Sequence, residues 1–322
     1  MKFRTEIESI SLTAKIDYST KIFAVGSCFA QNIAKRLYQA KFNIDFCPTG
    51  ILFNPASVAS TLTTFANGQT ADRARIVPRA EQFVSLDVHS DLAEDSFDRA
   101  VEAVNSATAL GNRLLSEAQC VIITFGTAWV YEHKATGKVV ANCHKLPQSE
   151  FTRRRLSVAE IIEAFKPLLE GALRGKNVIF TLSPVRHISD GLAENSLSKA
   201  TLRLAIAELC EQYDNADYFP AYEIVTDDLR DYRFYADDLV HPSAQAVEYI
   251  WEHFVASTLS STAQSLLPRV KKVVDAAAHR PISPQSEQYR LFCERYLQEA
   301  FSISEVDFSE ECAIFRRYSN KS

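Results

Sequence analysis

The sequence is poor in the features that mark several large classes of protein. Its 322 residues include only nine glycines and a single methionine, which indicates a helix-rich chain with few flexible linkers. No uninterrupted apolar run is long enough to cross a bilayer, so we expect no membrane-spanning segment and no membrane partner. Residues 1–6 lack the apolar core of a signal peptide, and no internal repeat or low-complexity tract is visible.

Charge and cysteine content exclude further classes. The net charge is −5 at pH 7 and no strong basic cluster is present, so we expect no nucleic-acid partner. The seven cysteines are odd in number and form no CxxC pair, a pattern typical of reduced thiols in a cytoplasmic protein. With 47% apolar and 23% charged residues, the composition is that of an ordinary soluble globular protein.

Short apolar runs, each followed by helical periodicity, predict an α/β fold. The runs are rich in β-branched and aromatic residues, which favours buried strands, and they lie at 21–25, 42–46, 120–125 and 177–182. The predicted helices cover 29–40, 95–117, 156–174, 198–213 and 243–259. A capping box from Ser157 to Glu160 marks the start of the third helix. This alternation predicts a mostly parallel central sheet with helices on both faces.

Two parts of the chain depart from this alternation. Residues 67–91 fit no strand–helix unit and predict an inserted loop with a strand near 83–88. Beyond residue 261 the pattern changes, and two amphipathic segments predict further helices, near 287–301 and 305–318. We therefore divide the chain into an α/β domain, residues 1–260, and a helical C-terminal extension, residues 261–322. The extension packs on the main domain or joins copies of the chain in a homo-oligomer.

The most informative stretch is the corner where the first predicted strand ends, Gly26-Ser27-Cys28. A strand that breaks at glycine and passes into a helix leaves a nucleophilic side chain at its carboxyl end. It also aims the first unpaired N–H groups of the helix at the same point. Ligands of open α/β sheets bind outside these strand ends. The corner therefore offers Cys28 and Ser27 as candidate nucleophiles; the alternatives are a packing role for Cys28 and an N-cap role for Ser27.

A second chemical pattern lies far downstream, at Asp238 and His241. In a loop, this spacing can bring the carboxylate onto one imidazole nitrogen and leave the other nitrogen to act as a general base. Pro242 and Ser243 predict that a helix begins directly afterwards, with Ser243 as its N-cap. The alternative is a turn aspartate beside a surface histidine. An early nucleophile with a late acid–histidine pair favours acyl-transfer chemistry.

Taken together, the sequence blocks resemble a known family. Residues 26–30 read Gly-Ser-Cys-Phe-Ala, the motif after which the GSCFA-domain proteins are named, and these proteins look like members of the SGNH (GDSL-like) hydrolase superfamily. The similarity covers roughly residues 20–256 and continues in blocks at 49–55, 125–131, 140–145, 183–187 and 229–235. The resemblance implies a three-layer α/β/α sandwich. It also implies an esterase or O-acyltransferase acting on a small-molecule or carbohydrate acyl substrate.

The resemblance assigns expected roles to single residues. The superfamily block Gly-Asp-Ser aligns with residues 26–28 and places Cys28 at the nucleophile, where the helix N-terminus and a nearby imidazole are expected to lower its pKa. Gly50 falls where the superfamily supplies a backbone N–H to the oxyanion. The third block should read Gly-x-Asn-Asp, but residues 126–129 read Gly-Thr-Ala-Trp. The usual oxyanion asparagine is therefore missing, and its replacement is the side-chain amide of Asn54 or Asn142, or backbone N–H groups alone.

Gly126, Arg186 and His187 are the expected substrate-binding residues. Arg186 could clamp a carboxylate or phosphate of the substrate or of a coenzyme A-type acyl donor, and His187 could assist acid–base chemistry. Structural hydrogen bonding explains both side chains equally well. The spacing of cysteine and histidine matches no zinc pattern, so we expect no metal and no resident cofactor. The missing asparagine favours a competing hypothesis, a non-catalytic ligand-binding module on the same scaffold.

Overall fold

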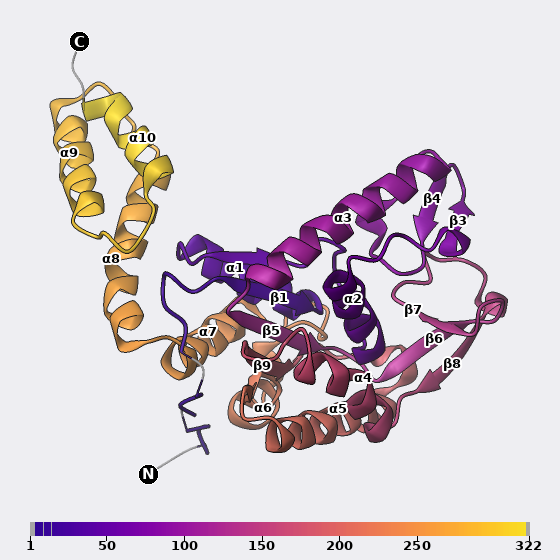
Figure 1. Cartoon of the computed structure of the whole chain (residues 1–322). Helices are drawn as coiled ribbons and strands as arrows, with labels where there is room; N and C mark the ends of the chain where they lie inside the picture. Colours follow the sequence, from indigo (N-terminus) through magenta and orange to yellow (C-terminus); the bar gives the residue numbers. More distant parts are fainter. Residues whose placement is uncertain (1–3, 9, 14, 320–322) are drawn as a thin grey trace.

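The structure, a computed structural model, describes residues 4–8, 10–13 and 15–319 of the chain. At its centre lies a five-stranded parallel sheet with the strand order β10-β9-β5-β1-β2 (Figure 1). Its strands are β1 (Ile22–Gly26), β2 (Ile44–Phe46), β5 (Cys120–Phe125), β9 (Asn177–Leu182) and β10 (Ala216–Phe219). The four predicted strands are confirmed. The fifth, β10, was not predicted because its Ala-Asp-Tyr-Phe sequence contains no apolar run.

Helices cover both faces of the sheet, as the alternating pattern predicts. One face packs against α1 (Cys28–Gln39), α6 (Ala221–Glu223) and α7 (Ala244–Thr258). The other packs against α2 (Pro55–Asn67), α3 (Phe97–Glu117), α4 (Val158–Glu170) and α5 (Leu192–Gln212). Side chains of β1 alternate between the two cores, with Ala24 on the first face and Val25 on the second. The chain is therefore a three-layer α/β/α sandwich.

Local sequence signals set the starts of two helices. The capping box between Ser157 and Glu160 is formed at the start of α4. The hydroxyl of Ser243 accepts a hydrogen bond from the N–H of Ala246 at 3.3 Å, so α7 begins where the sequence predicts. The missed helix α2 carries serine and threonine at many positions, which hides its apolar stripe.

Two small antiparallel sheets lie together on one side of the molecule (Figure 1). In the first, β3 (Ile76–Arg79) pairs with β4 (Gln82–Ser85), where the sequence predicts a loop with one strand. In the second, β6 (Trp129–His133) pairs with both β7 (Lys138–Val140) and β8 (Phe151–Arg155). Short 3-10 helices join the larger elements at Arg73–Arg75 (η1), Ser90–Leu92 (η2), Gln148–Glu150 (η3), Ile188–Asp190 (η4) and Tyr232–Phe234 (η6), and a π-helix covers Ile224–Leu229 (η5).

Three helices follow the sandwich and extend away from the sheet (Figure 1). They are α8 (Ser261–Ala278), α9 (Glu287–Phe301) and α10 (Ser309–Ser319), of which the last two were predicted. Their buried side chains join the same apolar cluster as those of α1 and α7, and Lys41 Nζ lies 3.0 Å from the carboxylate of Glu311 on α10. The division of the chain at residue 260 stays a prediction. None of the helices in the described ranges has the length and apolar character needed to cross a membrane.

Candidate active site

The order of the strands indicates a crevice at the carboxyl ends of two central strands. Numbered along the chain, the five strands lie in the order 2-1-3-4-5, so the direction in which the chain crosses the sheet reverses between β1 and β5. Ligands of such sheets bind at the carboxyl ends of the two strands that flank the reversal. Gly26 ends β1 at this edge, and Gly126 directly follows β5.

Gly26 fixes the point at which the chain leaves β1. Its φ is +128°, and a Cβ there would lie 2.1 Å from the carbonyl oxygen of Thr124 on β5. Glycine alone fits this conformation and this close approach of two backbones. The strand therefore stops at the switch point, and Ser27 and Cys28 follow at once.

The two candidate nucleophiles differ in accessibility. Ser27 occupies the N-cap position of α1, but its side chain does not cap the helix. It is 1% exposed, and its hydroxyl has no hydrogen-bond partner among the described residues. Cys28 begins α1 and is only partly buried. The backbone N–H groups of Phe29 and of Cys28 itself are close enough to the thiol to lower its pKa, so the start of the helix lies beside the sulfur.

The predicted lowering of the Cys28 pKa is wrong. Burial raises this pKa above its ordinary value and outweighs the two N–H groups and the charge of Lys199, which lower it. The helix N-terminus can be inferred from the sequence, but the loss of solvent around the sulfur, which penalises the charged form, depends on the fold. The resting side chain is therefore a thiol at neutral pH, and it needs a base to become a nucleophile.

Lys199 on α5 is a buried charged group that the sequence analysis missed. Its Nζ donates to the carbonyl oxygens of Gly126 and Ser183, each at 2.7 Å, and so ties the chain after β5 to the chain after β9. Burial lowers its pKa to about 7. The available signal was a lysine three residues before Leu202, on the apolar face of a predicted helix.

The imidazole of His187 lies close to Gly126, the residue that directly follows β5. A Cβ on Gly126 would lie 3.3 Å from His187 Nε2 and 3.4 Å from Ser27 Cβ, so a larger residue would crowd both neighbours. Burial, and then the charges of Lys199 and His241, lower the pKa of His187 to about 4. This imidazole is therefore neutral at pH 7, and it lies within electrostatic reach of both the buried lysine and the downstream histidine.

Asp238 and His241 form the pair that their spacing predicts. His241 Nδ1 and Asp238 Oδ2 are 2.6 Å apart, while Oδ1 of the same carboxylate accepts the N–H groups of His241 and Val240 at 2.9 Å. These hydrogen bonds lower the pKa of Asp238 to about 2. The N–H of Arg186 donates to the carbonyl of Val240 at 3.2 Å, which joins this loop to the chain after β9. Within the described residues, His241 makes no hydrogen bond to Cys28 or Ser27.

The expected oxyanion donors differ in whether their N–H groups already donate a hydrogen bond within the protein. The N–H of Gly50 donates to the carbonyl of Cys47 at 3.0 Å, so it is already engaged. Asn142 has both ends of its side chain occupied, by the Ser90 hydroxyl and the His144 N–H. The carbonyl of the Asn54 side chain caps α2 by accepting the Ser57 N–H at 2.8 Å. Its amide nitrogen has no protein partner in the described ranges.

Arg186 is engaged in a different way from the clamp that the sequence suggests. Its guanidinium lies over the ring of Tyr235, 4.0 Å from the centroid. Tyr232 lies 5.1 Å away on the same side. In this structure Arg186 therefore braces the segment before Asp238, and a substrate anion would compete with Tyr235 for it.

A cleft of about 680 Å³ opens beside the crevice. Phe53, Asn54 and His187 line its inner end, and its far wall is the face of β6 and β8 that carries Trp129 and Tyr131. The cleft also takes in Thr127, Val140, Ala141, Asn142, Cys143, Lys145, Leu146, Gln148 and Phe151. Trp129 Nε1 is buried and has no partner among the described residues. The cleft thus combines aromatic walls with amide groups. No group of three metal-binding side chains occurs in the part of the chain that the structure describes.

The fold and the site define an α/β sandwich protein with a thiol at the carboxyl edge of a parallel sheet. This chain belongs to the GSCFA family: the family profile matches residues 21–254. A second profile, that of the GSCFA domain protein C-terminal domain, matches residues 270–321, the region of α8 to α10. No curated protein matches the chain. The family part of the resemblance is therefore confirmed.

Proposed function

We propose that this chain performs acyl-group chemistry, as an esterase or O-acyltransferase of the SGNH type, with Cys28 as its nucleophile. The observation that carries the proposal is the convergence of groups at one sheet edge. Cys28 follows the end of β1 there, and Lys199 joins the chain after β5 to the chain after β9 beside it. The imidazole of His187 lies next to Gly126. The loop of His241 is attached to the same edge through Arg186.

His241 is the proposed general base. Asp238 accepts a hydrogen bond from the Nδ1–H of His241, which keeps the proton on Nδ1 and leaves Nε2 with a free lone pair. Nε2 takes the proton of the Cys28 thiol, and the sulfur attacks the carbonyl carbon of the ester. The tetrahedral intermediate expels the alcohol, which recovers that proton from His241. Water or a sugar hydroxyl then gives a proton to His241 and attacks the thioester carbonyl. The C–S bond breaks, the acid or the new ester leaves, and the thiolate of Cys28 takes the proton back from His241. In an empty site these catalytic hydrogen bonds are often long.

The side-chain amide of Asn54 and the first N–H groups of α1 are the proposed oxyanion donors. Asn54 lies at the inner end of the cleft, and its amide nitrogen is the donor that the fold leaves uncommitted. Gly50 is left out, because its N–H is bonded to Cys47. A single donor of this kind typically contributes about a hundred- to a thousandfold in rate.

The cleft supports an O-acylated carbohydrate as the substrate. Aromatic rings such as Trp129 and Tyr131 offer flat apolar surfaces to the C–H faces of a sugar, while Asn54 and Gln148 offer amide groups to its hydroxyls. A coenzyme A-type donor is the proposed co-substrate for the transferase form of the reaction. Its anionic groups would have to draw Arg186 away from Tyr235.

The second candidate is a ligand-binding module without catalysis. Two observations favour it: the absence of the superfamily asparagine after Gly126, and the raised pKa of Cys28. This alternative expects ligand binding in the cleft but no covalent labelling of the thiol. The two candidates are separated by the catalytic effect of the Asp238–His241 pair.

Asp238→Asn should lower the rate of p-nitrophenyl acetate hydrolysis by about a hundred- to ten-thousandfold. The amide cannot hold the Nδ1–H tautomer of His241 as the carboxylate does, so Nε2 is no longer available as a base. His241→Ala should cause a loss of the same order. Asp237→Asn is the matched control, since it removes a neighbouring carboxylate from the same loop and should keep the wild-type rate. Equal rates for wild type and Asp238→Asn would rule out this pair as the catalytic base.

A further inference from the structure

A second cavity, of about 410 Å³, lies outside the candidate active site. It is enclosed by α2, α3, the β3–β4 hairpin and β7, and its volume is within the range of small-molecule sites. Ala141 lines both this cavity and the cleft that reaches His187, so β7 and Ala141 form a partition between the two. The polar character of the second cavity is what distinguishes it.

One wall of the cavity is a stripe of hydroxyl groups on α2. The residues of this stripe follow the spacing of a single helix face and are Ser57, Ser60, Thr61 and Thr64. No hydrogen-bond partner is present among the described residues for the hydroxyls of Thr61 and Thr64. The adjacent Thr63 shows the usual behaviour of a helical threonine, since it donates to the Ala59 carbonyl at 2.8 Å. The stripe therefore presents unused hydroxyls to the cavity.

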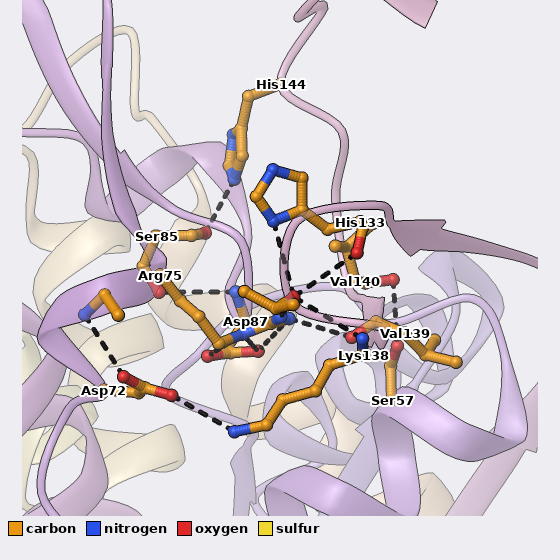
Figure 2. Close-up of polar contacts among 12 residues, drawn as sticks. Ser57, Asp72, Arg75, Ser85, Asp87, His133, Lys138, Val139, Val140 and His144 are labelled. Carbon is orange, nitrogen blue, oxygen red and sulfur yellow. Dashed lines mark hydrogen bonds and ion pairs between the residues drawn. The ribbon is translucent and has the colours of Figure 1, made fainter. Parts of the chain in front are cut away.

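The opposite wall holds two ion pairs, drawn in Figure 2. Arg75 is 2% exposed; its Nε lies 2.7 and 2.8 Å from the carboxylate oxygens of Asp87, and its Nη2 donates to the Val139 carbonyl. The side chain of Asp87 is still 40% exposed, so it can accept further hydrogen bonds. Lys138 pairs with Asp72 at 3.2 Å. The two cations and two anions cancel, so this wall attracts neither an anion nor a cation.

We propose that this cavity binds a neutral polyhydroxylated ligand, a sugar ring or a cyclic polyol. The Asp87 carboxylate, held in place by Arg75, would accept hydrogen bonds from neighbouring ligand hydroxyls. The hydroxyls of Thr61 and Thr64 can both donate and accept, which suits a ligand whose own groups do the same. Val104 supplies an apolar surface for its C–H groups. The site goes beyond the proposed acyl chemistry and does not depend on Cys28.

The test is ligand-observed saturation-transfer NMR of the full chain with D-glucose, D-galactose, N-acetylglucosamine and myo-inositol. We expect at least one of them to bind. The double variant Thr61→Val, Thr64→Val keeps the shape of both side chains and removes their hydroxyls, and it should weaken that binding about tenfold or more. A thermal melt establishes that the double variant is folded. Thr63→Val, on the same helix but outside the cavity, is the control and should keep the binding, because its hydroxyl is bonded to the Ala59 carbonyl.

Three results would overturn this site. They are the absence of binding by all four compounds, binding that the two valines leave unchanged, and binding that Thr63→Val weakens as much as the double variant does. Inorganic phosphate serves as the charged probe, and its displacing the sugar would contradict the neutral character of the wall. Cys28→Ala should retain the binding, so a failure of the acyl chemistry and a failure of this site give different results.

Discussion

Cys28→Ala should abolish p-nitrophenyl acetate hydrolysis, with a loss of about a thousandfold or more, because no other accessible nucleophile lies at the start of α1. The sulfur lies at the start of α1, beside its first N–H groups, and alanine leaves that position without a nucleophile. The measurement is kcat/KM from steady-state kinetics. A thermal melt verifies that the variant is folded.

Ser27→Ala is the matched control, since it removes the other candidate nucleophile from the same corner. It should keep a rate close to that of the wild type. Its free energy of unfolding should rise by about 1 kcal/mol, because the buried Ser27 hydroxyl has no partner and an unsatisfied polar group costs stability. A variant Ser27→Ala that is inactive beside an active Cys28→Ala would reverse the assignment.

Lys199→Met should change how stability depends on pH. Burial lowers the pKa of Lys199 from 10.5 to about 7, so between these values the unfolded chain carries a proton that the folded chain does not. Stability therefore rises with pH across this window and is independent of this group outside it. Within this window each pH unit changes the free energy of unfolding by at most ~1.4 kcal/mol. Between the two ends of the window, the free energy of unfolding of the wild type should therefore rise by about 4 kcal/mol relative to that of Lys199→Met.

Urea denaturation of both proteins across that range measures the effect. Lys176→Met is the matched control, because Lys176 Nζ also donates to two backbone carbonyls, those of Ser116 and Ala118, but lies much closer to solvent. Its pKa is lowered by burial as well, and the smaller burial predicts a smaller pH effect. Parallel curves for wild type and Lys199→Met would show that the buried lysine keeps an ordinary pKa.

The layers of the fold could be predicted because buried parallel strands leave a strong local signal. The runs at 120–125 and 177–182 coincide with β5 and β9, and the capping box marks the start of α4. The antiparallel sheet of β6, β7 and β8 left no such signal. Its strands mix aromatic, charged and small residues, since one face lines a cleft and the other meets the core.

The site could be predicted in its parts but not in its electrostatics. The Asp238–His241 contact follows from a spacing of three residues in a loop, which is local information. The raised pKa of Cys28 and the lowered pKa of Lys199 depend on how much solvent the surrounding helices exclude. That depends on contacts between residues far apart in the chain, such as Lys199 and Gly126, which neither residue's sequence neighbours reveal.

The most direct test of the proposed chemistry is to identify the residue that becomes acylated. The protein is mixed with p-nitrophenyl acetate, quenched in acid within one turnover and analysed by peptide mass spectrometry, with neutral hydroxylamine to recognise a thioester. Cys143, which is also partly buried, reports non-specific acetylation. We expect one hydroxylamine-sensitive acetyl group on Cys28, formed faster than any on Cys143. An acetyl group on Ser27, or a Cys28 labelled no faster than Cys143, would contradict a catalytic thiol at this corner.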